Sequence, residues 1–375
     1  MADMQTSLQT TRLASLRTLL AEKELDALLV SGPENRRFLS GFSAREEMLA
    51  ESCGSLLISA GAAYLLTDFR YRDWAAREAP AFEVLTYQAG LGDTLAGLLK
   101  ELGIRRLGFE AGYLTCRSYE RLAGDALQAG VEVEWSPREG MVESLREVKT
   151  PEEAALMRRA LALTEAVFRE VAPLVTPGLT ERRVAWEIER RLREGGAHGL
   201  AFSPIVAAGP NSARPHHHPG DYALREGDPV ILDLGARLEG YCADLTRTLC
   251  LGPPSDRFRE VYRTVREAQR RAEAGIVPGM MSDAADALAR EVIMAAGYGE
   301  AFGHSLGHGV GLAVHEAPSL SPYKDRVTPL KAGSIFTVEP GIYLTGWGGV
   351  RLEDMVLLHE DRAEVLTSLG FLELE

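Results

Sequence analysis

Residues 229–250 have the sequence PVILDLGARLEGYCADLTRTLC, and this stretch decides the fold of the second half of the chain. Two apolar, strand-like runs are separated by Glu239-Gly240, a pair typical of a tight turn between antiparallel strands. The first run contains Asp233 and the second contains Asp244. Because side chains alternate across a strand, the turn places both carboxylates on one face, as diagonal neighbours.

Two carboxylates this close together repel each other in an apolar environment. A buried or half-buried pair must share a proton or hold a cation. The same reasoning applies to Glu339 in SIFTVEPGIYL and Glu353 in GVRLEDMVLL, on two further predicted strands. A single acid on a strand is often only exposed to water, but two repeated pairs favour a metal site. With one imidazole, their charge of roughly −4 suits two divalent cations.

The second half of the chain contains an internal repeat. A helix, a Pro-Gly turn, a second helix and a glycine-rich loop are predicted around Pro177-Gly178 and again around Pro278-Gly279. Each copy is followed by one histidine and two acids: His216, Asp233 and Asp244 after the first, and His315, Glu339 and Glu353 after the second. Chance similarity is the alternative explanation, because helix pairs joined by Pro-Gly are common.

Three histidines lie in the glycine-rich segment FGHSLGHGVGLAVHEAP, residues 302–318. The glycines disfavour a helix, so we expect His304, His308 and His315 to lie in a loop that approaches a ligand closely. His216 lies in a second turn-rich segment, NSARPHHHPGD, which the repeat places opposite His315. The other histidines are as readily explained as packed or exposed bystanders.

The first 140 residues alternate between helix and strand signals. DALLVSG, GSLLISA, AYLLTDF, FEVLTY and VEVEWS predict short buried strands, and DTLAGLLKEL and RSYERLAGDAL predict helices between some of them. At Thr150 a capping residue, a proline and a glutamate three residues after the cap predict a new helix. We therefore predict an α/β (α+β) protein with a mixed domain over residues 1–142 and a second domain over residues 143–375.

Composition limits the class of protein. The chain has 375 residues, of which 46% are apolar and 25% charged, as in ordinary soluble globular proteins. Its net charge of −13 disfavours a nucleic-acid partner. No segment resembles a membrane span or an ordinary signal peptide, and the four cysteines lack the density of a disulfide scaffold. We expect a cytoplasmic protein with reduced thiols and no membrane partner.

Several sequence blocks resemble the pita-bread metallopeptidases, the family of methionine aminopeptidase, aminopeptidase P, prolidase and the non-metal enzyme creatinase. LDLGARLEGYCADLTRT, GHSLGHGVGLAVHE, VEPGIY and RLEDMV look like the family's metal-ligand blocks, in the family's order. FSPIVAAGPNSARPH is similar to its substrate-loop block, and FLSGFSA and TDFRY are similar to the domain that precedes the catalytic part of prolidase. The resemblance covers the whole chain and implies a creatinase-like N-terminal domain followed by a pita-bread catalytic domain.

The resemblance implies a role for each of five metal-binding positions. Asp233 would bind one metal ion, and His308 and Glu339 the other. Asp244 and Glu353 would bridge the two ions. Creatinase lacks the full set of ligands, whereas this chain has all five, so the pattern favours an enzyme over an inactive pita-bread module that binds other proteins. We expect Mn²⁺, with Co²⁺ or Zn²⁺ as alternatives that suit the same ligands.

The resemblance also implies catalytic and substrate-binding positions. Glu339 would transfer a proton, and His216 and His315 would contact the substrate and the tetrahedral intermediate. His304 and Arg351 match positions that favour enzymes acting on Xaa-Pro bonds, and Arg351 lies where it can orient the metal ligands. We therefore expect hydrolysis of the Xaa-Pro bond at the N-terminus of short peptides, by a homodimer as is usual in the family.

The preferred length of the peptide stays open. In prolidases an arginine often follows the HEAP-like segment, but this chain has Ser319 there, which favours aminopeptidase P and its longer substrates. Arg45, immediately after GFSA, favours an Xaa-Pro dipeptidase if it binds the free carboxylate of a dipeptide, although an ordinary solvated arginine is an equal alternative. We expect a dipeptidase (prolidase), with aminopeptidase P as the alternative.

Overall fold

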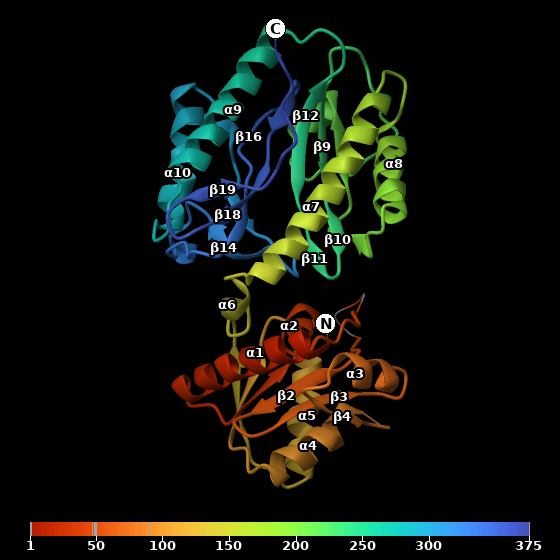
Figure 1. The fold of residues 1–375 in the computed structure, drawn as a ribbon, viewed down its shortest axis with the longest axis vertical. Helices are drawn as coiled ribbons and strands as arrows, with labels where there is room; N and C mark the ends of the chain where they lie inside the picture. Colours follow the sequence, from red (N-terminus) through yellow and green to blue (C-terminus); the bar gives the residue numbers. More distant parts are fainter. Residues whose placement is uncertain (1, 47, 49–50, 89, 375) are drawn as a thin grey trace. The chain divides into compact units, whose positions relative to one another are not determined.

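The structure of the chain, a computed structural model, describes residues 2–46, 48, 51–88 and 90–374. It divides into two compact units, Met1–Arg146 and Glu147–Glu375. Figure 1 draws the first unit in red to yellow and the second in yellow-green to blue. The boundary predicted after residue 142 assigns the short helix α6 (Glu143–Arg146) to the second domain instead, and that boundary stays a prediction.

The first unit is built on one mixed six-stranded sheet with the strand order β4-β3-β2-β1-β5-β6. Strand β1 pairs antiparallel with β2 and parallel with β5. The strands are β1 (Ala27–Val30), β2 (Ser55–Ser59), β3 (Ala63–Thr67), β4 (Glu83–Thr86), β5 (Arg106–Glu110) and β6 (Glu134–Arg138). The helices before α6 are α1 (Ala2–Glu22), α2 (Pro33–Ser40), α3 (Arg72–Glu78), α4 (Leu91–Glu101) and α5 (Cys116–Gln128).

Strand β5 is the element of this sheet that the sequence patterns did not predict. Its sequence RLGFE has charged ends and a central glycine, so it matches neither an apolar run nor a clean alternation. The structure pairs it with both β1 and β6 and buries Leu107 completely. Gly108 is required there because a Cβ at this position would lie 2.8 Å from the Leu25 side chain.

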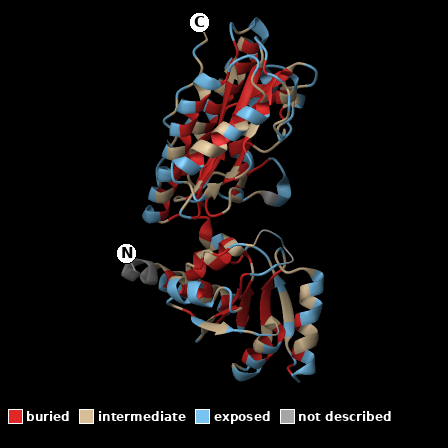
Figure 2. Ribbon diagram, turned by 90° about the vertical axis from the view of Figure 1, so that its right-hand side faces the viewer, coloured by how far each residue is buried: buried red, intermediate tan, exposed pale blue. Residues whose placement is uncertain are grey.

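The second unit places helices on both sides of antiparallel strands. Its long helices are α7 (Pro151–Val171), α8 (Glu181–Glu194), α9 (Asp256–Gly275) and α10 (Ser282–Ala295), and short 3-10 turns are η1 (Ala172–Leu174), η2 (Gly209–Ala213), η3 (Gly299–Ala301) and η4 (Lys324–Arg326). In Figure 1, α7 and α8 lie on one side of the strands and α9 and α10 on the other. Figure 2 shows that the strands are mostly buried, while the helices expose one side to solvent.

The strands of the second unit form four small sheets, with the orders β11-β10-β7, β12-β9-β8, β14-β13-β15-β18-β19 and β16-β17. In the first half they are β7 (Gly199–Leu200), β8 (Ile205–Ala208), β9 (Pro229–Leu234), β10 (Ala236–Leu238), β11 (Tyr241–Cys242) and β12 (Leu245–Cys250). In the second half they are β13 (Gly307–Gly309), β14 (Glu316–Leu320), β15 (Ile335–Val338), β16 (Gly341–Leu344), β17 (Gly348–Arg351), β18 (Asp354–Leu358) and β19 (Ala363–Val365).

Equivalent hydrogen bonds in the two halves confirm the predicted repeat. Gly178 N–H donates to the carbonyl of Leu224 over 2.9 Å, and Gly279 N–H donates to that of Leu330 over 2.8 Å. Both glycines have positive φ, 94° and 81°, a conformation that glycine adopts without strain. The predicted α7 start is also confirmed, because Thr150 and Glu153 form a reciprocal capping box.

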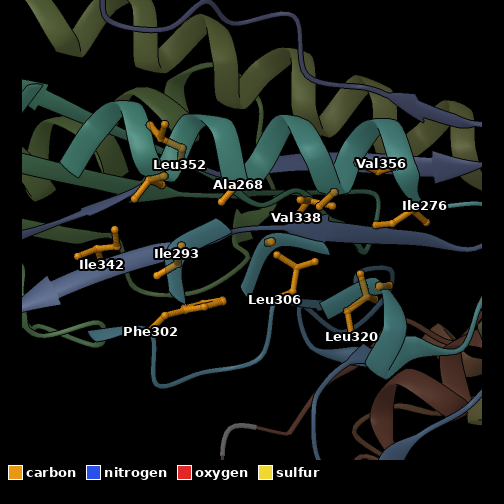
Figure 3. Packing of buried hydrophobic residues seen from close by; sticks show 14 of the residues in the cluster. Ala268, Ile276, Ile293, Phe302, Leu306, Leu320, Val338, Ile342, Leu352 and Val356 are labelled. Carbon is orange, nitrogen blue, oxygen red and sulfur yellow. The ribbon is translucent and has the colours of Figure 1, made fainter. Parts of the chain in front are cut away.

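The core of the second half packs α9 and α10 against β15, β16 and β18. Figure 3 shows Ala268 of α9 and Ile276, the residue after the end of α9, facing Val338 and Val356 of the strands. These four residues are at most 1% exposed. Dense packing of this kind fixes the strand ends where the acids lie, since interiors lack room for side chains to shift. Among the described residues, no helix has the length and apolar character needed to cross a bilayer.

Candidate metal centre

The predicted acids lie at strand ends that meet in the middle of the second unit. The β9–β12 ladder pairs Asp233 with Thr246, which leaves Asp244 diagonal to Asp233. The hairpin turn is as predicted, with Glu239 and Gly240 at φ 50° and 89°. Gly235 lies between β9 and β10. A Cβ there would lie 2.0 Å from a backbone carbonyl oxygen, so the close approach of the two backbones requires glycine.

The second pair of acids has a different register from the first. The β15–β18 ladder ends with Val338 opposite Asp354, so Glu339 and Glu353 each lie one residue beyond its last pair, whereas Asp233 lies within the β9–β12 ladder. The N–H of Glu353 donates to the carbonyl of Thr246 over 3.1 Å, which joins the second ladder to the first. We call this junction the seam.

A cavity of about 870 Å³ opens at the seam. Its lining includes all five predicted metal ligands: Asp233, Asp244, His308, Glu339 and Glu353. The predicted substrate-side residues of this unit also line it: His216, His304, His315, Ser319 and Arg351. The structure thus brings together every candidate that the sequence placed in the second domain.

Asp244, His308 and Glu353 form the tightest group. One donor atom from each lies within 4.8 Å of the other two. Nε2 of His308 lies 3.7 Å from Oδ2 of Asp244 and 3.1 Å from Oε1 of Glu339. The Nδ1 of His308 lies 3.1 Å from the carbonyl of Gly309, which can only accept, so Nδ1 carries a hydrogen and Nε2 faces the acids. This tautomer is the one a metal ligand needs.

Asp233 gives an independent test of whether these residues fit a metal. Its Oδ2 accepts a hydrogen bond from Arg351 over 2.6 Å. Its Oδ1 is buried and has no hydrogen-bond partner in the described part of the chain. An unpaired buried carboxylate oxygen is costly unless a cation lies beside it. Oxygen donors with one imidazole suit divalent ions, so the residues fit a metal centre.

The electrostatics of the acids agree with this fit. Burial and the neighbouring acids raise the pKa values of Asp244 and Glu353 well above the ordinary range. Burial also raises the pKa of Asp233, although Arg351 opposes it. Burial acts in the same direction on Glu339, but in the metal-free site the hydrogen bond and charge of a protonated His308 outweigh it and lower the pKa of Glu339 to about 2. The site therefore favours cations that let the other three acids ionise.

The position of His308 corrects one prediction. We expected it in a loop, but it lies in the short strand β13 between β14 and β15. Its flanking glycines are explained by close strand packing: a Cβ at Gly307 would lie 2.0 Å from the carbonyl oxygen of Thr337, and one at Gly309 would lie 2.1 Å from that of Ala317. His304 and His315 lie outside the strands, as predicted.

Comparison with known proteins identifies the family. Metallopeptidase family M24 matches residues 155–360, and the Creatinase/Prolidase N-terminal domain matches residues 12–148. The chain belongs to metallopeptidase family M24. This confirms a pita-bread catalytic domain that follows a creatinase-like domain, and it makes the chain a peptidase that uses divalent metal ions.

Three relatives are similar along almost the whole chain. The structure of the Xaa-Pro dipeptidase from Bacillus anthracis is 39% identical, with a TM-score of 0.90 over 97% of this chain and 98% of its own. The Xaa-Pro dipeptidase of Pyrococcus furiosus is 35% identical over 95% of this chain and 97% of its own length. The structure of X-Pro aminopeptidase from Thermotoga maritima is 37% identical, with a TM-score of 0.81 over 92% of this chain and 96% of its own.

A hydrogen-bonded chain connects His304 to Asp233 in this M24 protein. Nε2 of His304 lies 3.0 Å from the hydroxyl of Tyr343, which also accepts from Arg351 over 2.9 Å. Burial lowers the pKa of His304 and raises that of Tyr343 to about 12. A neutral imidazole and an un-ionised phenol are thus held side by side. The sequence patterns missed Tyr343, although it lies on β16, diagonal to Arg351 on β17.

His315 and His216 face the same cavity. The ring of His315 lies edge-on to that of His308, with the centroids 4.2 Å apart. Burial, followed by the charge of His308, lowers the pKa of His315 to about 4, so its imidazole is neutral at ordinary pH. His216 lines this cavity together with His304 and His315.

Two threonines that orient the acids were also missed. Thr246 donates to Oε2 of Glu353 over 2.6 Å, and Thr337 donates to Oε1 of Glu339 over 3.0 Å. Thr246 is two residues after Asp244, and Thr337 is two residues before Glu339. Strand alternation therefore puts each on the same face as an acid, and that was the available signal.

Arg45 lies in the first unit. It is half-exposed, and its guanidinium forms an ion pair with Oε1 of Glu34 over 2.6 Å. Any role at a substrate carboxylate would therefore compete with Glu34. That role stays a prediction.

Proposed function

We propose that this M24 peptidase hydrolyses the Xaa-Pro bond at the N-terminus of short peptides and acts mainly as an Xaa-Pro dipeptidase. The convergence of Asp244, His308 and Glu353 within 4.8 Å carries the proposal, because three ligand types that suit a divalent ion meet there. Xaa-Pro dipeptidases among the close relatives support the choice of substrate.

We further propose two metal ions per subunit, Mn²⁺ in preference to Co²⁺ or Zn²⁺. Asp233 would bind one ion, His308 and Glu339 the other, and Asp244 and Glu353 both. The buried and unpaired Oδ1 of Asp233 supports a ligand role for that residue. When bound, divalent ions supply Lewis-acid polarisation of the scissile carbonyl.

The protein's own side chains position the substrate and transfer the protons. Glu339, whose Oε1 lies 3.1 Å from His308 and accepts from Thr337, would accept a proton from the attacking water and pass it to the proline nitrogen as the bond breaks. His315 is neutral and can donate an N–H hydrogen bond to the carbonyl oxygen as it becomes negative. His216, which lines the cavity, would contact the substrate, while His304, Tyr343 and Arg351 keep Asp233 in place.

Aminopeptidase P activity is the second candidate, and Ser319 favours it. This residue lines the cavity without a charge, and Arg351, which lines it too, is already bonded to Asp233. A dipeptide carboxylate would therefore need Arg45 or an imidazole.

We propose a homodimeric, cytoplasmic enzyme with no nucleic-acid partner, consistent with the net charge of −13.

Hydrolysis of Ala-Pro, Ala-Pro-Ala and longer peptides, with Mn²⁺, Co²⁺ and Zn²⁺ in turn, tests the proposal. A dipeptidase gives a higher kcat/KM for Ala-Pro than for Ala-Pro-Ala. The reverse order assigns the chain to aminopeptidase P. A lack of hydrolysis with any of the three ions would sink the proposal, and sedimentation of the same preparation measures the oligomeric state.

A further inference from the structure

Residues 208–220, which we call the His216 segment, contribute four residues to the lining of the cavity. Pro215, His216, His217 and His218 of this segment line the cavity. The three histidines differ in exposure: His216 and His218 are exposed, whereas the side chain of His217 is only 9% exposed. The middle imidazole is therefore more buried than its two neighbours.

His217 is turned inward because it binds Glu181. Its Nε2 lies 2.8 Å from Oε2 of Glu181. A carboxylate only accepts, so Nε2 carries the hydrogen. Glu181 is the first residue of α8, where a negative charge is favourable, and its side chain is fully buried.

Glu181 also holds both ends of the His216 segment. Its Oε1 accepts from the N–H of Ala208 over 2.9 Å and from the amide of Asn211 over 3.0 Å. Its Oε2 accepts from the N–H of Gly220 over 3.1 Å. The four donors come from the beginning, the interior and the end of one segment, so a single buried carboxylate fixes its path.

His216 depends on this arrangement for its orientation. In the part of the chain that the structure describes, no residue hydrogen-bonds to its imidazole, so the backbone of the segment sets where that ring points. Its adjacent residue His217 is the side chain that ties this part of the backbone to Glu181.

The second half of the unit holds its own cavity histidine in a comparable way. Asp286 of α10 is buried and accepts from the N–H of Leu306 over 2.9 Å. Arg290 binds Asp286 through two hydrogen bonds and donates to the carbonyls of Phe302 and His304 over 2.8 and 2.7 Å. In both halves, an acid on the second helix thus fixes the segment that carries a substrate-side histidine.

We propose that His217, bound to Glu181, is a positioning residue that directs His216 toward the metal centre. This inference rests on the proposed peptidase function for its kinetic readout. A substrate contact that shifts by about 1 Å can cost roughly 10²-fold in rate. We therefore expect H217A to lower kcat/KM for Ala-Pro by about 10- to 100-fold at full metal content.

The test compares H217A and H217Q with a matched control in the full-length, metal-loaded enzyme. Glutamine can donate an amide hydrogen to Glu181, so H217Q should recover most of the lost kcat/KM. The control is H359A, which removes another histidine bonded to a glutamate, His359 to Glu364 over 2.6 Å, at a half-exposed site that does not line the cavity. H359A should keep the parent values of kcat and KM.

Hydrogen exchange gives a readout that does not depend on hydrolysis. In H217A the amide of Gly220, which shares Oε2 of Glu181 with His217, should exchange faster than in the parent protein. Faster exchange with parent kinetics would overturn the positioning role, and so would a kinetic loss that H217Q does not recover or that follows loss of metal. If the parent protein itself fails to cleave Xaa-Pro peptides, the proposed function fails, whereas the exchange result still decides whether His217 anchors the segment.

Discussion

Replacing Asp244 with asparagine should change stability in opposite directions with and without metal. Asparagine keeps the shape of the side chain and removes its charge. Asp244 is 5% exposed and shares the cavity wall with Asp233, Glu339 and Glu353. Without metal these carboxylates repel one another, so D244N removes part of that repulsion. We therefore expect a higher Tm in chelator, by roughly 2–4 °C for each kcal/mol relieved in a domain of this size.

With metal bound, D244N should lower the Tm instead of raising it. Oδ2 of Asp244 lies 3.7 Å from Nε2 of His308, which sets the distance scale of the site. At about 4 Å, two unit charges interact by about 4 kcal/mol at an effective dielectric constant of ~20, which is roughly a thousandfold in affinity, and a divalent ion interacts more strongly. D244N should therefore bind metal at least about a thousandfold more weakly, lose the metal-dependent rise in Tm and lose hydrolysis of Ala-Pro.

Calorimetry with Mn²⁺ and with EDTA, together with metal analysis after desalting, measures both effects. D221N is the matched control, because the Asp221 side chain is 79% exposed in a surface pair with Arg182. It should leave metal content and both Tm values unchanged. A D244N protein that keeps two ions and full turnover, or whose Tm in EDTA falls, would refute the reasoning.

Three further predictions concern single acids and one arginine. E339Q should lower turnover by orders of magnitude while metal affinity drops less, because the amide cannot transfer a proton; strictly parallel losses of rate and metal would leave Glu339 as a ligand only. R45A should raise KM for Ala-Pro more than for Ala-Pro-Ala, and equal effects on both would exclude Arg45 from dipeptide recognition. Burial raises the pKa of Glu110 from its ordinary 4.5 to about 7, although hydrogen bonds from Gly32 and Asn35 act to lower it. Between these two pH values Glu110 is protonated in the folded first unit but ionised in the unfolded chain. The free energy of unfolding of this unit should therefore fall as pH rises from about 5 to about 8. Denaturant titrations of E110Q should show that this pH dependence is lost.

The sequence predicted those site residues that a pattern in the neighbouring residues indicates. The grouping of Asp233 with Asp244 follows from strand alternation and one turn, and both the turn and the register are as expected. Tyr343 and β5 carry no comparable local signal. Tyr343 becomes significant only when folding brings Arg351 and His304 to its hydroxyl.

The histidine segment shows a second limit of sequence reasoning. Glycines around His308 were interpreted as a loop, because glycine usually marks flexible backbone. In the structure the same glycines permit β13 to lie against the backbones of two neighbouring strands. Glycine composition alone does not distinguish these two uses, since both follow from the missing Cβ.

The seam has a consequence for how the protein is made. Asp233 and Asp244 are synthesised well before His308, Glu339 and Glu353, and the hydrogen bond from Glu353 to Thr246 joins the two halves. Domains emerge from the ribosome beginning with their N-terminal parts. The first pair of aspartates must therefore wait for the second half before the donors of a complete metal centre can assemble. A nascent chain released before residue 353 carries acids for a metal but lacks the full set of ligands to retain one.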